Sequence, residues 1–556
     1  MTRAPATCGW PATPAASWSC ETPEPDFREG QRVAQDVIAA VQQAYGFSGP
    51  SVDLGALVVD GTAHPEAQVR LPLAMMNRHG LVAGATGTGK TKTLQLVAEQ
   101  LSAAGVPVFL ADIKGDLSGM ATAGQPSERV TTRAASVGGD AWSPAGMPVE
   151  FYALGGKGSG AAVRAKITSF GPVLLSKVLG LNEVQSSSLG LAFHYADANG
   201  LELDDLKDLR AVITYLTSDE GQADLHALGG LSKATAGVIL RELIGFEDQG
   251  AEAFFGEPEL DTADLLRTTP DGQGVVSVME LPGVQDQPRL FSTFLMWLLA
   301  DLFHELPEVG DVEKPKLVFF FDEAHLLFDD ASKAFLDSVA QTVRLIRSKG
   351  VGVFFVTQTP KDVPADVLAQ LGNRVQHALR AYTPEDAKAL KATVSTFPKS
   401  AYDLEELLTT LGIGEAVVTV LSENGAPTPV AWTRLRPPRS LMAQLDPAQQ
   451  SAMLAASAVA QRYAAPVDDA SAYEKLQARE QALKEAAEQP AAAPPQREDP
   501  PEAGRSKAAG VGVAGGILAS PIFRSFARSA ASAAGREISR SLFGTAPRRR
   551  RRRGSF

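Results

Sequence analysis

Cysteine is nearly absent from this sequence, and so are long apolar runs. Among its 556 residues the only two cysteines are Cys8 and Cys20, both close to the N-terminus. Disulfide bonds therefore play no part in the rest of the chain, and a reducing compartment fits. No run approaches the roughly 20 consecutive apolar residues that cross a bilayer, and the first 24 residues lack the apolar stretch of a secretory signal. These absences predict a cytoplasmic protein with no integral membrane segment.

Two common kinds of catalytic site are also missing from the sequence. Its histidines and cysteines do not cluster with the spacing of a zinc site. No arrangement of serine, histidine and aspartate indicates a nucleophilic hydrolase. The chemistry must therefore reside in other residue types.

Basic charge is scarce outside the C-terminus. From Arg505 to Phe556 the chain has 12 Arg or Lys residues against the single acid Glu537, and the remainder has 40 basic and 63 acidic residues. The overall net charge is −12. A protein that binds nucleic acid over its whole surface is expected to be basic. Any nucleic-acid contact is therefore expected to be local, in a pore, a groove or the tail.

Apolar runs bounded by turn residues predict an α/β fold with a mainly parallel sheet. A strand, loop, helix and strand follow one another between Gly80 and Asp112. The strand pattern resumes later in the chain, separated by helical stretches near 288–305 and 332–348, and a closing hairpin is expected at Glu415–Leu421 and Val430–Arg434. The expected strands are Gly80–Ala83, Pro107–Asp112, Gly274–Leu281, Lys316–Asp322, Val351–Thr357 and Gln376–Ala381.

Composition and periodicity divide the chain into eight stretches. The core is split in two by a mainly helical insertion, and the chain closes on a Gly/Ala-rich basic tail that contains Arg548–Arg553. The expected stretches are a disordered extension (1–25), an N-terminal segment leading into the core (26–80), the first part of the core (81–160), the insertion (161–270), the second part of the core (271–440), a helical C-terminal segment (441–488), a linker (489–510) and the disordered tail (511–556).

The segment Gly84-Ala85-Thr86-Gly87-Thr88-Gly89-Lys90-Thr91 is a complete phosphate-binding loop, the Walker A pattern, between an expected strand and an expected helix. Its glycines let backbone N–H groups turn inward around phosphate oxygens. The following helix points its positive end at the phosphates. Lys90 is expected to reach the β- and γ-phosphates, and the Thr91 hydroxyl to ligate Mg²⁺. The loop therefore predicts a site for ATP and Mg²⁺.

Two further elements predict hydrolysis rather than binding alone. The apolar run Leu317–Phe321 ends in Asp322 and Glu323, the Walker B pattern. Asp322 is expected to hold Mg²⁺ and Glu323 to polarise the attacking water. Gln358 follows another apolar strand, and ligands of an open parallel sheet bind beyond the carboxyl ends of its strands. Gln358 is therefore expected to sense the γ-phosphate or the water, with a capped strand end as the alternative.

These elements resemble the HerA/FtsK group of P-loop ATPases, and most closely its YjgR-like branch of HerA-like helicase C-terminal domain proteins. The resemblance covers roughly residues 68–435. It is carried by Asn77-Arg78-His79-Gly80 running into the loop, Ala111-Asp112-Ile113-Lys114-Gly115-Asp116-Leu117, Lys316–His325, Arg344–Val353 running into Thr357-Gln358, and Leu371–Arg380.

The resemblance implies a RecA-like core, ring-shaped homo-oligomers such as hexamers, and ATP hydrolysis at subunit interfaces that drives translocation along DNA. It also implies that Arg347, and as a second candidate Arg374, contacts nucleotide, often from the neighbouring subunit. A surface or helix-capping arginine is the alternative for each. The segment before the loop is too short for the N-terminal barrel with which HerA docks a nuclease, so a nuclease partner is not expected.

Several interpretations stay open at this level. Asp112, Lys114 and Asp116 either support the metal or the Glu323 water, or form a salt-bridged turn. His325 either couples the nucleotide state to a neighbouring loop or caps a helix. The arginine tail binds nucleic acid, an anionic membrane surface or the acidic body of the chain itself.

The function predicted from sequence is that of an Mg²⁺-dependent P-loop ATPase acting as a DNA translocase or helicase-like motor. The alternative is a scaffold or regulator that hydrolyses ATP and switches partners without moving on DNA. The acidity of the chain outside its tail is the observation that keeps this alternative open.

Overall fold

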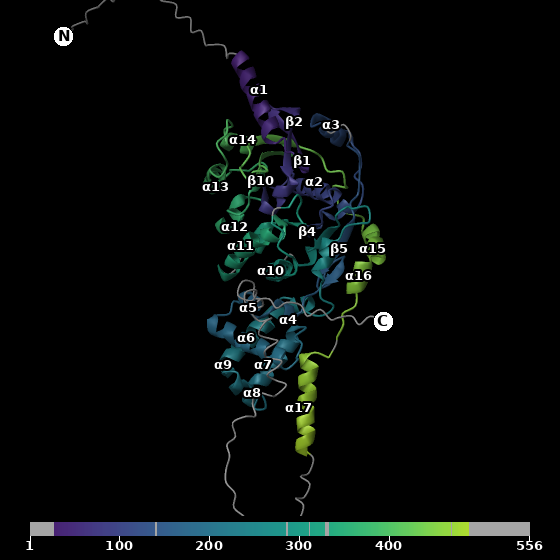
Figure 1. Ribbon diagram of the computed structural model, residues 1–556, viewed down its shortest axis with the longest axis vertical. Helices are drawn as coiled ribbons and strands as arrows, with labels where there is room; N and C mark the ends of the chain where they lie inside the picture. Colours follow the sequence, from purple (N-terminus) through teal and green to yellow (C-terminus); the bar gives the residue numbers. More distant parts are fainter. Residues whose placement is uncertain are drawn as a thin grey trace, which may run out of the picture.

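A sheet of 12 strands runs through the protein (Figure 1). The computed structural model describes residues 27–488 except 139–141, 285–286, 311, 329–332 and 469. The extension (1–25), the linker (489–510) and the tail (511–556, with Arg548–Arg553) expected from the sequence lie outside the described residues. In Figure 1 helix α1 (Phe27–Ala44) stands at one end of the described chain and α17 (Ala472–Glu488) at the other.

The strands of the middle and one side of the sheet are parallel, in the order β10-β3-β9-β8-β4-β7-β5-β6. Parallel strands are covered on both faces, which explains why they read as continuous apolar runs. The expected α/β class with a mainly parallel sheet is confirmed. The bounds are β3 (Gly80–Ala83), β4 (Val108–Asp112), β5 (Val149–Leu154), β6 (Ala161–Val163), β7 (Val276–Glu280), β8 (Leu317–Phe321), β9 (Val351–Thr357) and β10 (Asn373–Gln376).

One strand prediction is displaced. A strand was expected at Gln376–Ala381, but β10 ends at Gln376. The chain turns there toward the segment after β3, because the His377 N–H donates to the Ala83 carbonyl (2.7 Å) and the Ala378 carbonyl accepts from the Ala85 N–H (2.8 Å). The apolar residues Ala378 and Leu379 then pack against a separate apolar cluster that includes Leu408, instead of extending the strand.

An antiparallel extension completes the other side of the sheet. The expected hairpin is confirmed as β11 (Glu415–Thr419) and β12 (Ala431–Leu435), with β11 antiparallel to β10. The N-terminal segment adds β1 (Ser51–Val59) and β2 (Thr62–Pro72), so that β1 pairs with β12. Residues from both ends of the core therefore lie in one ladder.

Alternate residues of the central strands supply two cores. Phe319 and Phe321 of β8 point to the face covered by α10 (Pro288–Glu305) and α11 (Lys333–Ile346), while Val318 and Phe320 point to the face covered by α2 (Lys90–Ala103). Successive side chains of a strand lie on opposite faces, so one apolar run can fill both cores. The shorter surface helices are α3 (Glu128–Ser136), α12 (Ala365–Leu368), α13 (Pro384–Val394) and α14 (Leu404–Thr410).

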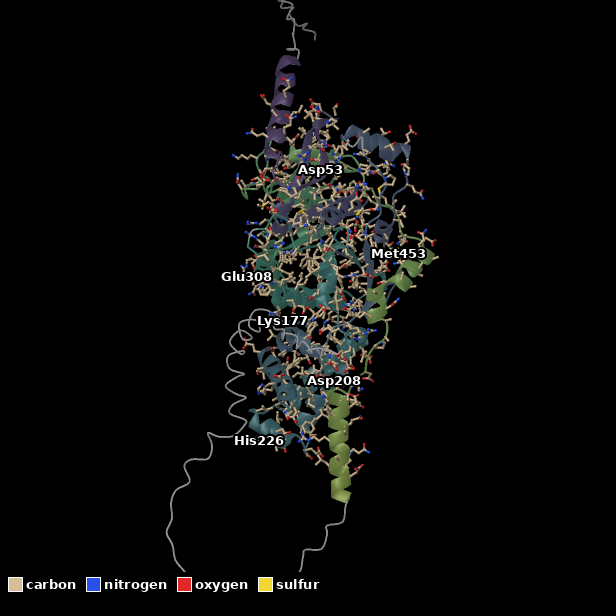
Figure 2. The ribbon with its side chains drawn as sticks, turned by 45° about the vertical axis from the view of Figure 1, so that its right-hand side comes forward. Asp53, Lys177, Asp208, His226, Glu308 and Met453 are labelled. Carbon is tan, nitrogen blue, oxygen red and sulfur yellow. The ribbon has the colours of Figure 1, made fainter. Side chains whose placement is uncertain are left out.

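The middle of the chain forms a helical unit below the sheet in Figure 1. Its helices lie between Ile167 and Asp248, and the strand β6 precedes them, so the stretch expected to be helical from residue 161 begins with a strand. Lys177, labelled in Figure 2, bridges this unit to the core by donating from Nζ to the Ser338 hydroxyl of α11 (2.5 Å). The helices are α4 (Ile167–Phe170), α5 (Pro172–Val178), α6 (Glu183–Ala198), α7 (Leu206–Thr217), α8 (Gln222–Ala227) and α9 (Lys233–Asp248).

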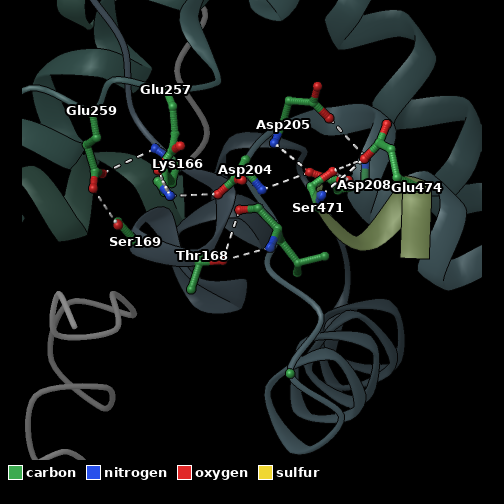
Figure 3. Close-up of polar contacts among 12 residues, drawn as sticks. Lys166, Thr168, Ser169, Asp204, Asp205, Asp208, Glu257, Glu259, Ser471 and Glu474 are labelled. Atoms are coloured by element: carbon green, nitrogen blue, oxygen red, sulfur yellow. Dashed lines mark hydrogen bonds and ion pairs between the residues drawn. The ribbon is translucent and has the colours of Figure 1, made fainter. Parts of the chain in front are cut away.

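A polar junction joins this unit to the C-terminal helix α17, which lies beside it (Figure 3). The two helices before α17 are α15 (Pro447–Ala456) and α16 (Ala458–Tyr463), which lie beside the sheet in Figure 1. Asp208 of α7 is the centre of the junction: one carboxylate oxygen accepts from the Ser471 hydroxyl (2.6 Å) and the Tyr473 N–H (2.9 Å), and the other from the N–H groups of Asp204 (2.9 Å) and Asp205 (3.2 Å). The same carboxylate thus caps the N-terminus of α7 and holds the start of α17 against it.

Candidate active site

The glycine-rich loop between β3 and α2 has the backbone that phosphate binding requires. Gly84, Gly87 and Gly89 have φ angles of 156°, 80° and 112°. Residues with a Cβ atom rarely adopt such positive values. Gly89 is the N-cap of α2 and has no side chain to cover the first N–H groups of the helix. These N–H groups and the positive end of the 14-residue helix α2 are therefore available to an anion.

Lys90 lies within this loop. Its Nζ donates to the carbonyls of Gly84 (2.7 Å) and Ala85 (3.3 Å), and the side chain is nearly buried. Burial lowers the pKa of Lys90 from its usual value. The Thr88 hydroxyl also donates to Ala85 (2.7 Å), and half-buried Thr91 stands one residue after Lys90. The loop thus holds its lysine at the place where phosphate oxygens would meet it.

Neighbouring segments support the loop from below. The Gly84 N–H donates to the Thr357 carbonyl of β9 (3.2 Å), and the Gly414 N–H donates to Thr88 (3.0 Å). Buried His377 shares a hydrogen bond with the Thr93 hydroxyl of α2 (Nε2 to Oγ1, 2.9 Å). Sequence reasoning missed His377, because its partner is 284 positions away. The sequence held no signal for this role, because His377 fell inside the strand expected at Gln376–Ala381, whereas β10 ends at Gln376.

Asp322 and Glu323 follow β8 at the same edge of the sheet. Asp322 is 1 % exposed; its Oδ1 accepts from the Glu323 N–H (2.9 Å), while Oδ2 has no hydrogen-bond partner among the described residues. Burial raises the pKa of Asp322 to about 6. A buried carboxylate oxygen without a donor is what a divalent cation would occupy. The residues present therefore fit an Mg²⁺ ion.

Glu323 stands in the left-handed region with φ 46° and is 6 % exposed. The Lys114 ammonium donates to its Oε1, and His325 Nδ1 lies 3.3 Å from its Oε2. Burial alone would raise the pKa of Glu323, but the Lys114 ammonium lowers it below its usual value. Lys114 therefore contacts the expected catalytic carboxylate directly, and His325 faces that carboxylate as well.

The strand order places the end of β9 between the glycine-rich loop and the acidic pair Asp322 and Glu323. Strand β9 separates β3 from β8, so its end, Thr357, lies between the loop and the acidic pair. Adjacent strands are about 4.8 Å apart, which puts the β3 and β8 ends about 10 Å apart. The Thr357 hydroxyl donates to Asp362 (2.8 Å), and Gln358 is exposed directly beyond it. Gln358 is thus at the edge where the sequence placed it.

The two candidate arginines lie away from this cluster. Arg347 is exposed in a turn just before β9, at the opposite end of that strand from Gln358. Arg374 is the second residue of β10, and its Nη1 donates to the Thr396 hydroxyl (2.5 Å). Burial lowers the pKa of Arg374. Within one chain the structure brings together Lys90, Asp322 and Glu323, and it does not bring either arginine to them.

The described residues contain neither a membrane-spanning helix nor a cluster of metal-ligating side chains. In that part of the chain no helix has the length and apolarity needed to cross a bilayer. Within the same residues, no group of three or more His, Cys, Asp or Glu side chains is arranged to hold a metal ion. The cation position at Asp322 would therefore depend on the hydroxyl of Thr91 and on bound phosphate for further ligands.

A protein-family model described as Helicase HerA-like C-terminal matches residues 58–552. The chain is also 29% identical over 153 residues to a probable helicase of Methanocaldococcus jannaschii. That match spans 26% of this chain and 28% of the relative, so the chain covers less than a third of the relative's length.

Among solved structures, the bacterial conjugative coupling protein TrwBdeltaN70 matches with 16% identity and a TM-score of 0.48, over 74% of this chain and 94% of that chain. VirB4 of Thermoanaerobacter pseudethanolicus matches with 14% identity and a TM-score of 0.42, over 70% and 97% of the two chains. At these values the likeness adds nothing to the topology described above.

Proposed function

The chain belongs to the family of HerA-like helicase C-terminal proteins, and we propose that it is an Mg²⁺-dependent ATPase that acts as a ring-shaped motor on DNA. The observation that carries the proposal is the convergence of three groups at one edge of a parallel sheet. These are the loop that holds Lys90, the buried Asp322 with its unpartnered oxygen, and Glu323. Phosphoryl transfer requires a phosphate cradle, a cation position and a group that activates water.

Each residue has a role in the proposed reaction. The loop N–H groups and Lys90 bind the β- and γ-phosphates. Thr91 and Asp322 would hold Mg²⁺, which when bound neutralises charge on the phosphate oxygens. Glu323 accepts a proton as water attacks the γ-phosphorus, while the bond to the bridging oxygen of ADP breaks. Gln358 orients that water from the end of β9. The products are ADP and inorganic phosphate.

The position of Arg347 supports assembly. It lies at the amino end of β9, whereas its own nucleotide edge is at the carboxyl end. A β9 strand of seven residues separates the two by about 20 Å. This position is compatible with the role that the family resemblance implies, in which Arg347 serves the nucleotide of a neighbouring subunit and accelerates its hydrolysis in trans. Arg374 remains the second candidate for this role.

Phosphate release tests the ATPase proposal. The purified protein is expected to release phosphate from ATP with Mg²⁺, and Lys90→Ala to lose both nucleotide binding and hydrolysis. Lys233→Ala, which removes a largely exposed lysine of α9, is the matched control and keeps the wild-type rate. Nucleotide binding that survives in Lys90→Ala, or a wild-type protein that releases no phosphate, contradicts the proposal.

DNA stimulation tests the motor. Single- or double-stranded DNA at low salt is expected to raise the rate of hydrolysis, and added salt to remove the effect as counterions compete for the phosphates. If the protein hydrolyses ATP but DNA does not change the rate at any salt concentration, the motor proposal is wrong. The protein is then a scaffold or regulator that switches partners with its nucleotide state. The net charge of about −23 outside Arg505–Phe556 is the observation behind that second candidate.

A further inference from the structure

We propose that Lys114 is a positioning residue for hydrolysis, which holds the Glu323 carboxylate in the orientation that activates water. The proposal rests on the proposed ATPase and names a residue that sets its rate. Its basis is the direct contact of the Lys114 Nζ with Glu323 Oε1. No other lysine or arginine of the described residues is paired with Glu323, whose second oxygen faces His325.

The strand order brings Lys114 and Glu323 together. Strands β4 and β8 are adjacent and parallel, with Ala111 opposite Phe321. The residues that follow the two strands therefore leave the sheet side by side. Lys114 comes two positions after the end of β4, and Glu323 two positions after the end of β8. The pair thus joins two loops that are more than 200 positions apart in sequence.

The turn that carries Lys114 is itself held firmly. Both oxygens of Asp112 are occupied by backbone N–H groups of the turn, from Gly115 (2.7 Å), Asp116 (3.3 Å) and Leu117 (2.8 Å). Gly115 has φ 74°, and a Cβ there would lie 3.3 Å from the Pro282 side chain. The backbone that carries Lys114 is therefore held by the turn, which keeps its ammonium within reach of Glu323. An ammonium anchored in this way can orient the buried carboxylate to which it donates.

Charge explains why Glu323 needs such a partner. Asp116 and Asp322 also lie close enough to Lys114 to interact with it electrostatically. Without the ammonium, Glu323 would face the like charge of Asp322 at low solvent exposure and would turn away from it. Lys114 thus keeps Glu323 at the nucleotide edge beside the carboxylates of Asp116 and Asp322.

Direct binding of phosphate by Lys114 is the competing role, and steady-state kinetics separate the two. If Lys114 acts through Glu323, Lys114→Met lowers kcat by about 10- to 100-fold while KM and the Kd of a fluorescent ATP analogue change less than about 3-fold. Lys114→Arg is expected to recover most of kcat, because it restores the ion pair. Lys233→Met, at a largely exposed position of α9, is the control and keeps the wild-type values.

A double-mutant cycle completes the test. In a Glu323→Gln background the further change Lys114→Met is expected to have no effect on the residual rate, because the group that it positions is already gone. An unchanged kcat in Lys114→Met, an equal loss of affinity and kcat, or full additivity with Glu323→Gln overturns the proposal. These outcomes require a wild type that hydrolyses ATP, so they are distinct from failure of the ATPase itself.

Discussion

The buried carboxylates of this protein differ in what occupies their oxygens. Glu99 of α2, 2 % exposed, accepts four hydrogen bonds from Arg439 and Ser440, and Asp112 accepts three from its own turn. Asp322 accepts one and leaves an oxygen without a partner among the described residues. The hydrogen-bonded carboxylates of Glu99 and Asp112 hold segments together, whereas the unpartnered Asp322 oxygen, at the edge beside the glycine-rich loop, is suited to a cation. Glu99 thus holds the segment that follows β12 against helix α2.

Glu99 is expected to make stability depend on pH. Burial raises its pKa from 4.5 to about 7, so between these values the folded chain binds a proton that the unfolded chain releases. Its contribution to stability is therefore largest below the unfolded value and is lost as pH rises toward 7, with a slope of up to about 1.4 kcal/mol per pH unit. Thermal denaturation at a series of pH values measures this.

Glu99→Gln is the comparison, since it removes the titration at nearly constant size. The melting temperature of the wild type is expected to fall more steeply than that of Glu99→Gln as pH rises from about 5 to about 8. Parallel curves for the two proteins would show that Glu99 does not carry this dependence.

Among the elements, the attachment of α17 depends on one carboxylate more than on any surface charge pair. Asp208 is 1 % exposed and receives four donors from two segments, including Ser471 and Tyr473 at the start of α17. Its neighbour Lys207 makes an ion pair with Glu474 of α17, but both side chains are exposed. A buried acceptor with several hydrogen-bond donors contributes much more to the free energy of unfolding than an exposed ion pair does.

The two neighbours on α7 give a matched test. Asp208→Asn is expected to lower the free energy of unfolding by about 2–3 kcal/mol, because an amide N–H₂ would meet N–H and O–H donors. Lys207→Met is expected to cost less than about 1 kcal/mol. Urea denaturation of the full chain measures both, and limited proteolysis reports whether α17 is released. If the two changes lower the free energy of unfolding equally, Asp208 does not attach α17 more strongly than the Lys207–Glu474 ion pair does.

For the whole molecule, the sheet separates the nucleotide edge from Arg347 by the length of β9. A single chain therefore leaves its site without that arginine, and the proposed activity depends on assembly. Two inactive variants are then expected to complement each other in a mixed ring. One supplies an intact loop and the other an intact arginine.

Mixing tests this at the level of the assembly. Lys90→Ala and Arg347→Ala are each expected to be nearly inactive, and an equal mixture that exchanges subunits to regain about a quarter of the wild-type rate per site, the random fraction of intact interfaces. Mass measurement of the mixture, with a non-hydrolysable nucleotide, checks that rings form and exchange. No recovery in exchanging rings would place Arg347 outside the site, and Arg374→Ala would be mixed next.

The sequence by itself determined the local elements, and it named candidate phosphate-site residues that remain predictions. Strands β3, β4, β8 and β9 lie within one residue of their predicted bounds, and the helix expected after the loop is α2. The strand predictions succeeded because the strands are buried on both faces and read as unbroken apolar runs. The loop could be named from sequence because its glycines, lysine and threonine form one contiguous pattern.

Only the tertiary structure decided which distant groups meet. The contact of Lys114 with Glu323 depends on β4 and β8 being neighbours, and the support of the loop by His377 depends on β10 pairing with β3. The order of parallel strands follows from how helices pack against both faces of the whole sheet, and the local pattern of any one strand does not contain it. The family resemblance named Arg347 as a candidate for a neighbouring subunit's nucleotide, and the structure places it at the end of β9 opposite to its own chain's nucleotide edge.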